Sequence, residues 1–205
     1  QGFDTSPLIA TVRELQPIRL ELVEQTDWEP IWNALMREHH YLGHRKMVGA
    51  HVKYFAFSGK RPLAALGWRA PSLKLEVRDA FIGWSSQQRK SFLPHLANNN
   101  RFLILPWIQV PHLGSHLLSR TLRVLSRDWR AKYGSALWLV ETFVDPRRFR
   151  GTVYRAANWL HLGSTQGFTK KGPTYRYHGH PKEVFVYVLA PRFRNDIGCR
   201  PRPPR

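Results

Sequence analysis

Cysteine is nearly missing from this chain, since Cys199 is the only one among 205 residues. No disulfide can form within the chain, and the composition suits a reducing compartment. Long apolar runs are also lacking, because residues 102–119 carry no Lys, Arg, Asp or Glu but are interrupted by two prolines, a glutamine and a glycine. This pattern argues against a membrane-spanning helix. The first ten residues lack a basic segment followed by an apolar one, so we expect no targeting signal and a cytoplasmic location.

Acidic residues are few as well. The chain has 14 Asp and Glu against 32 Lys and Arg, which gives a formal net charge of +18 and a pI near 10.9. Such an excess predicts a polyanionic partner. DNA or RNA is favoured over a membrane surface, because the basic residues are spread along the chain and no separate basic amphipathic segment is present. The alternative is a protein that simply has a basic surface.

The apolar pattern predicts a folded α/β protein. With 42% hydrophobic residues, the chain is long enough for one sizeable core. We predict a single domain over residues 1–190, an insertion at about 71–100 that carries one helix, and an extended or flexible Pro/Arg-rich tail over 191–205. Strands are predicted at 18–23, 48–58, 62–68, 101–110, 136–143, 160–169 and 184–189, helices at 28–40, 116–131 and 149–160, and a turn at Asn98–Asn100.

The region 101–167 has the most regular pattern. A nearly continuous apolar strand is broken at residues 111–115 and followed by a helix with leucines on one face. The opposite face of that helix carries Arg120, Arg123, Arg127 and Arg130. A second basic group, Arg147, Arg148, Arg150 and Arg155, opens the next predicted helix. Arginine forks match phosphate oxygens, so both groups are candidate nucleic-acid contacts, unless they are merely solvated helix faces.

Aromatic side chains offer candidate surfaces for base stacking. The candidates are Trp84, Trp107, Phe149 and Tyr175. Stacking on aromatic rings is a common mode of single-strand recognition. Each of these residues could equally belong to the core.

Three carboxylates are candidate catalytic and metal-binding groups. Glu141 and Asp145 close a predicted central strand, and Asp79 lies in the insertion. Oxygen ligands suit Mg²⁺, which would support phosphoryl transfer at the end of this strand. The alternative is that Glu141 and Asp145 pair with Arg147 and Arg150 and neutralise a crowded basic surface.

The predicted order of elements resembles the GNAT acetyltransferase fold, a mixed sheet flanked by helices. A closer resemblance rests on longer stretches: His40-Tyr41-Leu42-Gly43, Phe81-Ile82-Gly83-Trp84-Ser85, Arg101-Phe102-Leu103-Ile104-Leu105-Pro106 and most of residues 141–159. These resemble the family typified by the A protein of the Druantia anti-phage system, whose relatives also occur beside transposable elements. The resemblance implies a role in phage defence or in a mobile element.

The GNAT resemblance also implies where coenzyme A would bind. Gly114 and Ser115 would offer backbone N–H groups to the pyrophosphate, as at other helix starts. The first glycine of the expected Gly-x-Gly falls on His112, and the usual general-acid tyrosine falls on Trp159, which leaves Tyr154 as a substitute. We therefore expect coenzyme A not to bind well.

Three functions remain open on the sequence alone. The first is a nucleic-acid-binding protein of phage defence or transposition, with or without Mg²⁺-dependent phosphoryl transfer. The second is an N-acyltransferase that uses coenzyme A or aminoacyl-tRNA. The third is a noncatalytic adaptor for a helicase or another subunit of a defence system.

Overall fold

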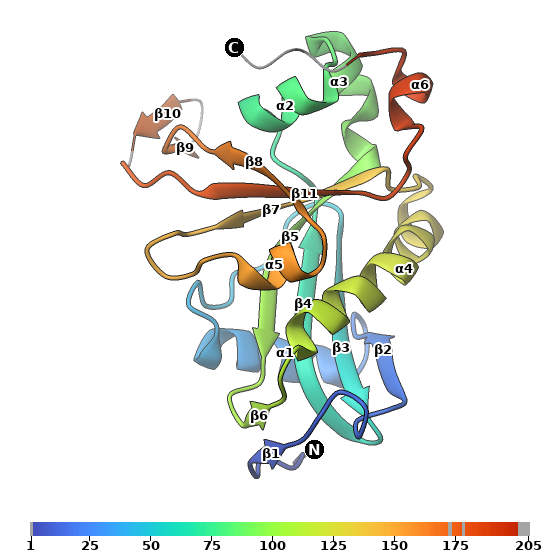
Figure 1. Ribbon diagram of the computed structural model, residues 1–205, viewed down its shortest axis with the longest axis vertical. Coiled ribbons are helices and arrows are strands. Elements are labelled where there is room, and N and C mark those ends of the chain that lie inside the picture. The colour runs from blue at the N-terminus through green and yellow to red at the C-terminus, as the bar shows by residue number, and fades with distance from the viewer. Residues whose placement is uncertain (1, 172–173, 178, 201–205) are drawn as a thin grey trace. The chain divides into compact units, whose positions relative to one another are not determined.

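The protein is built around a mixed β-sheet (Figure 1). The computed structural model describes residues 2–171, 174–177 and 179–200. Strands of the main sheet are β2 (Ile18–Leu22), β3 (His51–Ser58), β4 (Arg61–Arg69), β5 (Leu96–Ile104), β7 (Leu139–Val144), β8 (Leu160–Ser164) and β11 (Glu183–Val188). Their hydrogen-bonded order is β2-β3-β4-β5-β7-β11-β8. Since β5 and β7 are parallel while β2-β3-β4 and β7-β11-β8 are antiparallel, the predicted mixed α/β sheet is confirmed.

Helices and two small strand pairs complete the fold. The helices are α1 (Trp28–His39), α2 (Glu76–Ile82), α3 (Ser86–Phe92), the 3-10 turn η1 (Leu93–His95), α4 (Leu113–Tyr133), α5 (Thr152–Ala156) and α6 (Phe193–Ile197). The pairs are β1 (Leu8–Ile9) with β6 (Ile108–Gln109), parallel, and β9 (Phe168–Lys171) with β10 (Thr174–Tyr177), antiparallel. In the described part of the chain, no helix is long and apolar enough to cross a membrane.

The chain forms two compact units. The first comprises Gln1–Arg69 and Asn99–Leu125, and the second comprises Ala70–Asn98 and Ser126–Arg205. Strand β5 therefore contributes its first three residues to the second unit and the rest to the first. Residues 1–190, which the sequence predicts to be a single domain, contribute to both units.

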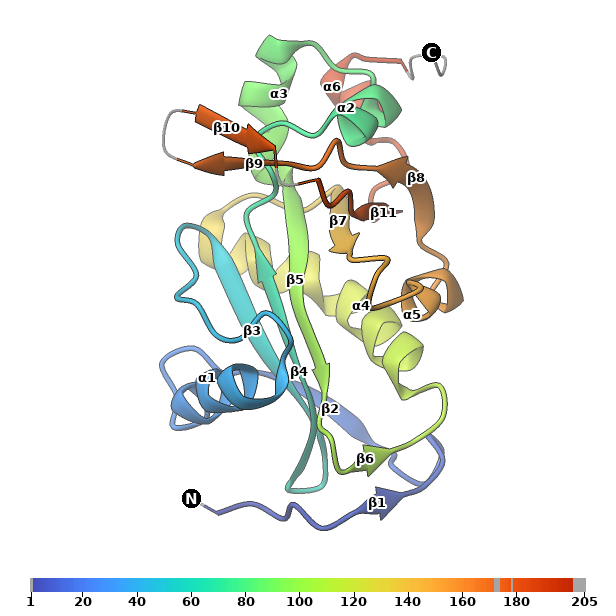
Figure 2. The same ribbon diagram turned by 90° about the vertical axis from the view of Figure 1, so that its left-hand side faces the viewer.

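In the first unit, helix α1 packs on one face of β3 and β4 (Figure 2). Its Trp32 is fully buried and donates Nε1–H to the Tyr54 carbonyl at 3.2 Å. Gly67 of β4 makes the close approach possible, because a Cβ there would lie 2.7 Å from Met47 Cε and 3.2 Å from the Trp32 ring. The spacing of the apolar residues thus determines which face of α1 packs on the sheet, and Gly67 leaves room for the Trp32 ring on that sheet.

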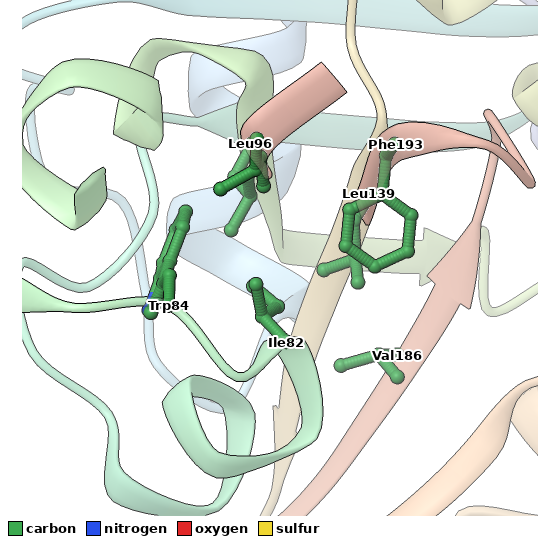
Figure 3. Close-up of a cluster of buried hydrophobic side chains, with 7 residues drawn as sticks. Ile82, Trp84, Leu96, Leu139, Val186 and Phe193 are labelled. Carbon is green, nitrogen blue, oxygen red and sulfur yellow. The ribbon is translucent and has the colours of Figure 1, made fainter. Parts of the chain in front are cut away.

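The second unit has its own apolar core (Figure 3). The core joins residues from α2, the loop after it, β5, β7, β11 and α6: Ile82, Trp84, Leu96, Leu139, Val186, Phe193 and Ile197. Phe193 is 1% exposed, and Cys199 just beyond α6 donates its thiol to the Ile82 carbonyl at 3.3 Å. The prediction of an extended tail is therefore wrong for residues 193–197, where Phe193 and Ile197 fall one turn apart and anchor a helix; residues 201–205 lie outside the described part.

Three other predictions of local structure are wrong. Asn98–Asn100 form part of β5 and not a turn, because Asn99 Nδ2 donates to the Gly67 carbonyl at 3.0 Å and so is satisfied within the sheet. The insertion carries two helices, α2 and α3, and the second begins with a capping box between Ser85 and Gln88. Helix α5 is shorter than the predicted 149–160 because left-handed residues, Gly151 and Asn158, bound it.

Candidate nucleic-acid interface

The loop after β7 is a continuous exposed and basic segment. Residues 146–150 are all exposed, and three of them are the predicted contacts Arg147, Arg148 and Arg150. Between them, Phe149 is 48% exposed, which is unusual for a large apolar ring. The sequence Pro146–Arg150, called the arginine loop below, therefore combines exposed cations with a partly exposed aromatic ring.

Asp145 holds the arginine loop in place from its buried side. Its carboxylate accepts two hydrogen bonds from the Arg147 guanidinium, at 2.9 and 2.7 Å, and a third from the Arg147 backbone N–H at 3.1 Å. Its carbonyl accepts the N–H groups of Arg148 and Phe149. Hydrogen bonding to Arg147 is the main reason that the pKa of Asp145 falls to about 2, so this carboxylate stays charged at neutral pH. The next residues are thus fixed in one turn.

Gly151 links the arginine loop to α5. It has φ of +68° and stands at the N-cap of the helix, and a Cβ there would lie 2.7 Å from the Phe185 ring. Arg155, one turn into α5, lies over the same ring at 5.1 Å and is exposed. The Phe185 ring therefore packs against the N-cap residue Gly151 and also lies under the exposed guanidinium of Arg155.

Positive charge in this region exceeds the local acid. Asp145 is used by Arg147, and Glu183 pairs with His161 and accepts a hydrogen bond from Ser164. Arg150 makes no ion pair or hydrogen bond with the residues that the structure describes. A surface arginine without an acidic partner, as Arg150 is within the described residues, is energetically suited to a polyanion.

The arginines of α4 are also at the surface. Arg123, Arg127 and Arg130 are exposed and Arg120 is half-buried. In the first unit, Arg120 lies 3.5 Å from the Gln16 amide oxygen. In the second unit, Arg127 pairs with Asp128 at 2.9 Å, and Arg127 and Arg130 line a shallow depression of about 530 Å³. These residues remain predicted contacts.

The aromatic candidates for stacking differ in exposure. Phe149 is largely exposed, whereas Trp84 is 3% exposed and donates its indole N–H to Asp79 at 3.0 Å. Trp107 packs edge-on against His39 at 5.8 Å and beside Phe3. Tyr175 lies outside the residues whose side chains are described. Phe149 is therefore the stacking candidate that the structure places beside the predicted arginines.

The predicted metal ligands are held by arginines. Glu141 is fully buried and accepts Arg78 Nη1 at 2.8 Å, Ser72 N–H at 2.9 Å and Asn98 Nδ2 at 3.2 Å. Asp79 accepts the other side of the Arg78 guanidinium at 2.8 Å and pairs with Arg89 at 3.3 Å. Among the described residues, no three His, Cys, Asp or Glu side chains form a group that could hold a metal ion.

Arg78 is the residue that the sequence did not reveal. It is 0% exposed and joins Asp79 to Glu141, which lies 63 positions after Arg78 itself. Asp79 and Glu141 therefore lie near each other, as an acidic site would require, but both carboxylates bind the guanidinium of Arg78. Asp145 belongs to the arginine loop instead. Of the alternative pairing, the Asp145–Arg147 half is confirmed, whereas Glu141 pairs with Arg78 and not with Arg150. A basic residue within an amphipathic turn of the insertion was the only available signal.

The turn that the GNAT resemblance assigns to a pyrophosphate lies at the start of α4. His112 has φ of +63°, the left-handed conformation that favours glycine, and its carbonyl accepts the hydroxyl of Ser115 at 3.1 Å. The N–H groups of Gly114 and Ser115 have no partner within the described residues.

Tyr154, the predicted substitute acid, is 8% exposed, and its hydroxyl accepts a hydrogen bond from the Thr142 hydroxyl at 3.3 Å. Trp159 is 5% exposed.

Comparison with protein families gives one assignment. The family described as Druantia protein DruA matches residues 3–171. The chain belongs to this family. The match spans elements of both units, from the N-terminal residues to β9. The comparison with curated proteins found no match.

Solved structures with the same fold are GNAT acetyltransferases. An aminoglycoside acetyltransferase, AAC(6')-Ib, in complex with ribostamycin and coenzyme A, has a TM-score of 0.54 and 13% identity over 87% of this chain and 96% of that chain. The spermidine/spermine N-acetyltransferase SpeG from Vibrio cholerae, in complex with manganese ions, has a TM-score of 0.51 and 11% identity over 87% and 96%. At these identities the likeness confirms the GNAT fold of this DruA family member.

Proposed function

We propose that this DruA family protein is a nucleic-acid-binding component of phage defence and that the arginine loop is its contact surface. The observation that carries the proposal is the exposed Phe149 between Arg148 and Arg150, on a loop fixed by Asp145. Phosphates would contact the guanidinium groups, and an unstacked base would lie on the phenyl ring. The net charge of +18 supports the same class of partner.

The setting follows from the family. Its description as a Druantia protein favours phage defence over transposition, and a defence role against DNA or RNA is consistent with a cytoplasmic protein that works with a helicase or another subunit. The proposal contains no metal step, because Asp79, Glu141 and Asp145 each hold an arginine.

The test is a salt titration of binding to a DNA duplex. Arg148→Gln with Arg150→Gln should reduce the slope of log affinity against log salt concentration by about 2, because each lost phosphate contact contributes about 0.9. Lys74→Gln with Arg192→Gln removes the same charge from two exposed positions of the same unit and should leave the slope within about 0.5 of the wild-type value. Equal slopes for the two double variants would refute the arginine loop as the contact surface.

Phe149 has a separate readout. Phe149→Ala should weaken binding to single-stranded DNA by roughly tenfold while duplex affinity changes little, because base stacking contributes about 1–3 kcal/mol and needs an unpaired base. A loss shared by both forms of DNA would instead indicate that the substitution disturbs the loop.

A second candidate function is N-acyl transfer with coenzyme A. It is supported by the left-handed His112 and the two open N–H groups of Gly114 and Ser115, which suit a pyrophosphate. The bound coenzyme would supply the acyl thioester. Calorimetry with coenzyme A tests it: a dissociation constant in the low micromolar range, typical of enzyme substrates, would place this function first, and no heat at about 1 mM would exclude it.

A further inference from the structure

Two arginines, the buried Arg78 and the half-buried Arg101, have opposite surroundings. In the second unit Arg78 faces two carboxylates, which raise its pKa in spite of burial. In the first unit Arg101, on β5, is half-buried, and its guanidinium meets only carbonyls: Nε donates to Gly43 O at 3.1 Å and Nη1 to Asn100 O at 2.7 Å. Its Nη2 has no partner among the described residues. A cation in this position lacks the counter-charge that buried arginines normally have.

The groups around Arg101 add positive charge. Burial, Arg69 and Arg45 lower the pKa of Arg101, whereas Tyr41 is the one neighbour that raises it. Arg69 ends β4 two residues after Gly67, whose Cβ position is 3.1 Å from Arg101 Cβ, so strand periodicity puts both arginines on one face of the sheet. Neither Arg45 nor Arg69 makes an ion pair within the described part of the chain. Both are exposed and can reach a ligand from solvent.

His40 contributes an N–H donor. The Leu42 N–H donates to His40 Nδ1 at 3.2 Å, which leaves the proton of the neutral ring on Nε2. Burial, and then the charge of Arg101, lower the pKa of His40 to about 4, so the ring is neutral at pH 7. Gly43, with φ of +61°, turns the same loop so that its carbonyl meets Arg101. The loop after α1 and the middle of β5 are thus locked together.

The acid of this sheet face is already used. On the neighbouring strand, Lys53 pairs with Glu29 of α1 at 2.7 Å and also donates to Asn33 at 2.9 Å. His44, whose pKa is lowered mainly by burial and then by Lys53, Arg37 and Arg101, has a buried Nε2 atom without a hydrogen-bond partner. Glu29 therefore has no second charge to offer to Arg101.

We propose that Arg101, Arg69, Arg45 and His40 form a binding site for a phosphate group carried by a nucleotide. The negative charge of one carboxylate would not neutralise three guanidinium groups. A phosphomonoester offers about two negative charges and three acceptor oxygens. The Tyr41 ring beside His40 is 37% exposed and provides an aromatic neighbour for the rest of a nucleotide. The site goes beyond the proposed function, because it shares no residue with the arginine loop.

The test is calorimetry of the full chain with inorganic phosphate and with adenosine 5′-monophosphate. We expect binding of both, with adenosine alone at least tenfold weaker. Arg69→Gln should weaken both ligands about tenfold, since one bidentate contact is lost. Arg13→Gln, an exposed arginine of the same unit, should change them less than about twofold. Arg101→Lys retains the charge without the fork and should weaken binding by a similar factor to Arg69→Gln.

Two further arms separate the sources of the phosphate. An oligonucleotide with a 5′-phosphate that binds at least tenfold tighter than its 5′-hydroxyl form, with the gain lost in Arg69→Gln, would identify a strand end; equal affinity together with binding of the monophosphate would identify a free nucleotide. Arg148→Gln with Arg150→Gln should leave monophosphate binding unchanged, which separates this site from the arginine loop. No heat with phosphate or monophosphate at about 10 mM, or an equal loss in Arg13→Gln, would overturn the proposal.

Discussion

Arg78 is the buried cation on which the acid cluster of the second unit depends. Burial lowers its pKa, but the Glu141 and Asp79 carboxylates outweigh that effect and raise it. The Oε1 atom of Glu141 also accepts a hydrogen bond from Asn98 Nδ2, and Asp79 Oδ1 accepts one from the Trp84 indole. Burying these charges costs little folding free energy while every charge is paired, but removing one of them leaves its partner buried without a counter-charge and is strongly destabilising.

Arg78→Met should therefore be strongly destabilising. It leaves Glu141 buried without its counter-charge, and we expect a loss of about 3–5 kcal/mol in the free energy of unfolding. Glu141→Gln should also lower stability by a few kcal/mol, because it removes one of the two counter-charges of the buried guanidinium. Urea denaturation measures both. If Glu141→Gln has wild-type stability but loses defence activity, the carboxylate has a chemical role beyond holding Arg78.

Asp145 gives the protein a pH response at strongly acidic pH. Its folded pKa of about 2 is below the ordinary value of 3.8, mainly because of Arg147, so the folded state binds the proton less readily than the unfolded state. The resulting stabilisation is complete above the unfolded pKa and is lost as pH falls through about 4 towards 2. Arg147→Gln should return the Asp145 pKa towards 3.8 in a carboxyl NMR titration; an unchanged value would mean that Arg147 does not hold the loop.

At the scale of elements, Gly151 decides whether α5 can begin where it does. Gly151→Ala adds a Cβ 2.7 Å from the Phe185 ring in a left-handed conformation. We expect a loss of about 2–4 kcal/mol, combining the backbone strain with displacement of the ring. Gly59→Ala, with φ of +56° and open space around its Cβ position, is the matched control and should cost about 1 kcal/mol. Equal losses in thermal unfolding would exclude the ring contact.

Local pattern predicted the elements that are stabilised locally. Helix α1 and the β3-β4 hairpin appear close to their predicted ranges, because apolar periodicity sets both. Strand β5 was misplaced, since three consecutive asparagines favour a turn in isolation. In the structure, Asn98 and Asn99 find partners on Glu141 and Gly67 that are far away in the sequence. Tertiary contacts override the local preference there.

At the scale of the whole molecule, composition leads to a prediction of a polyanionic partner, but it does not indicate which residues would bind that partner. The charge of +18 is a sum over all residues, and it cannot separate Arg78, which is used internally, from Arg150, which is exposed. The same holds for the acids, of which Glu141 was expected at a catalytic site and is enclosed with a guanidinium. Only the fold distinguishes charges that stabilise the interior from charges left for a ligand.

Because α6 is anchored in the core, the rate at which a reagent labels Cys199 reports the local unfolding of this helix. Its thiol is half-buried against the Ile82 carbonyl, and burial raises its pKa, so a thiol reagent must wait for the C-terminal helix to detach. With one cysteine in the chain, the labelling trace reports a single event. Phe193→Ala, which empties the α6 anchor, should speed labelling by at least tenfold at constant reagent concentration, whereas Asn195→Ala on the exposed side should not.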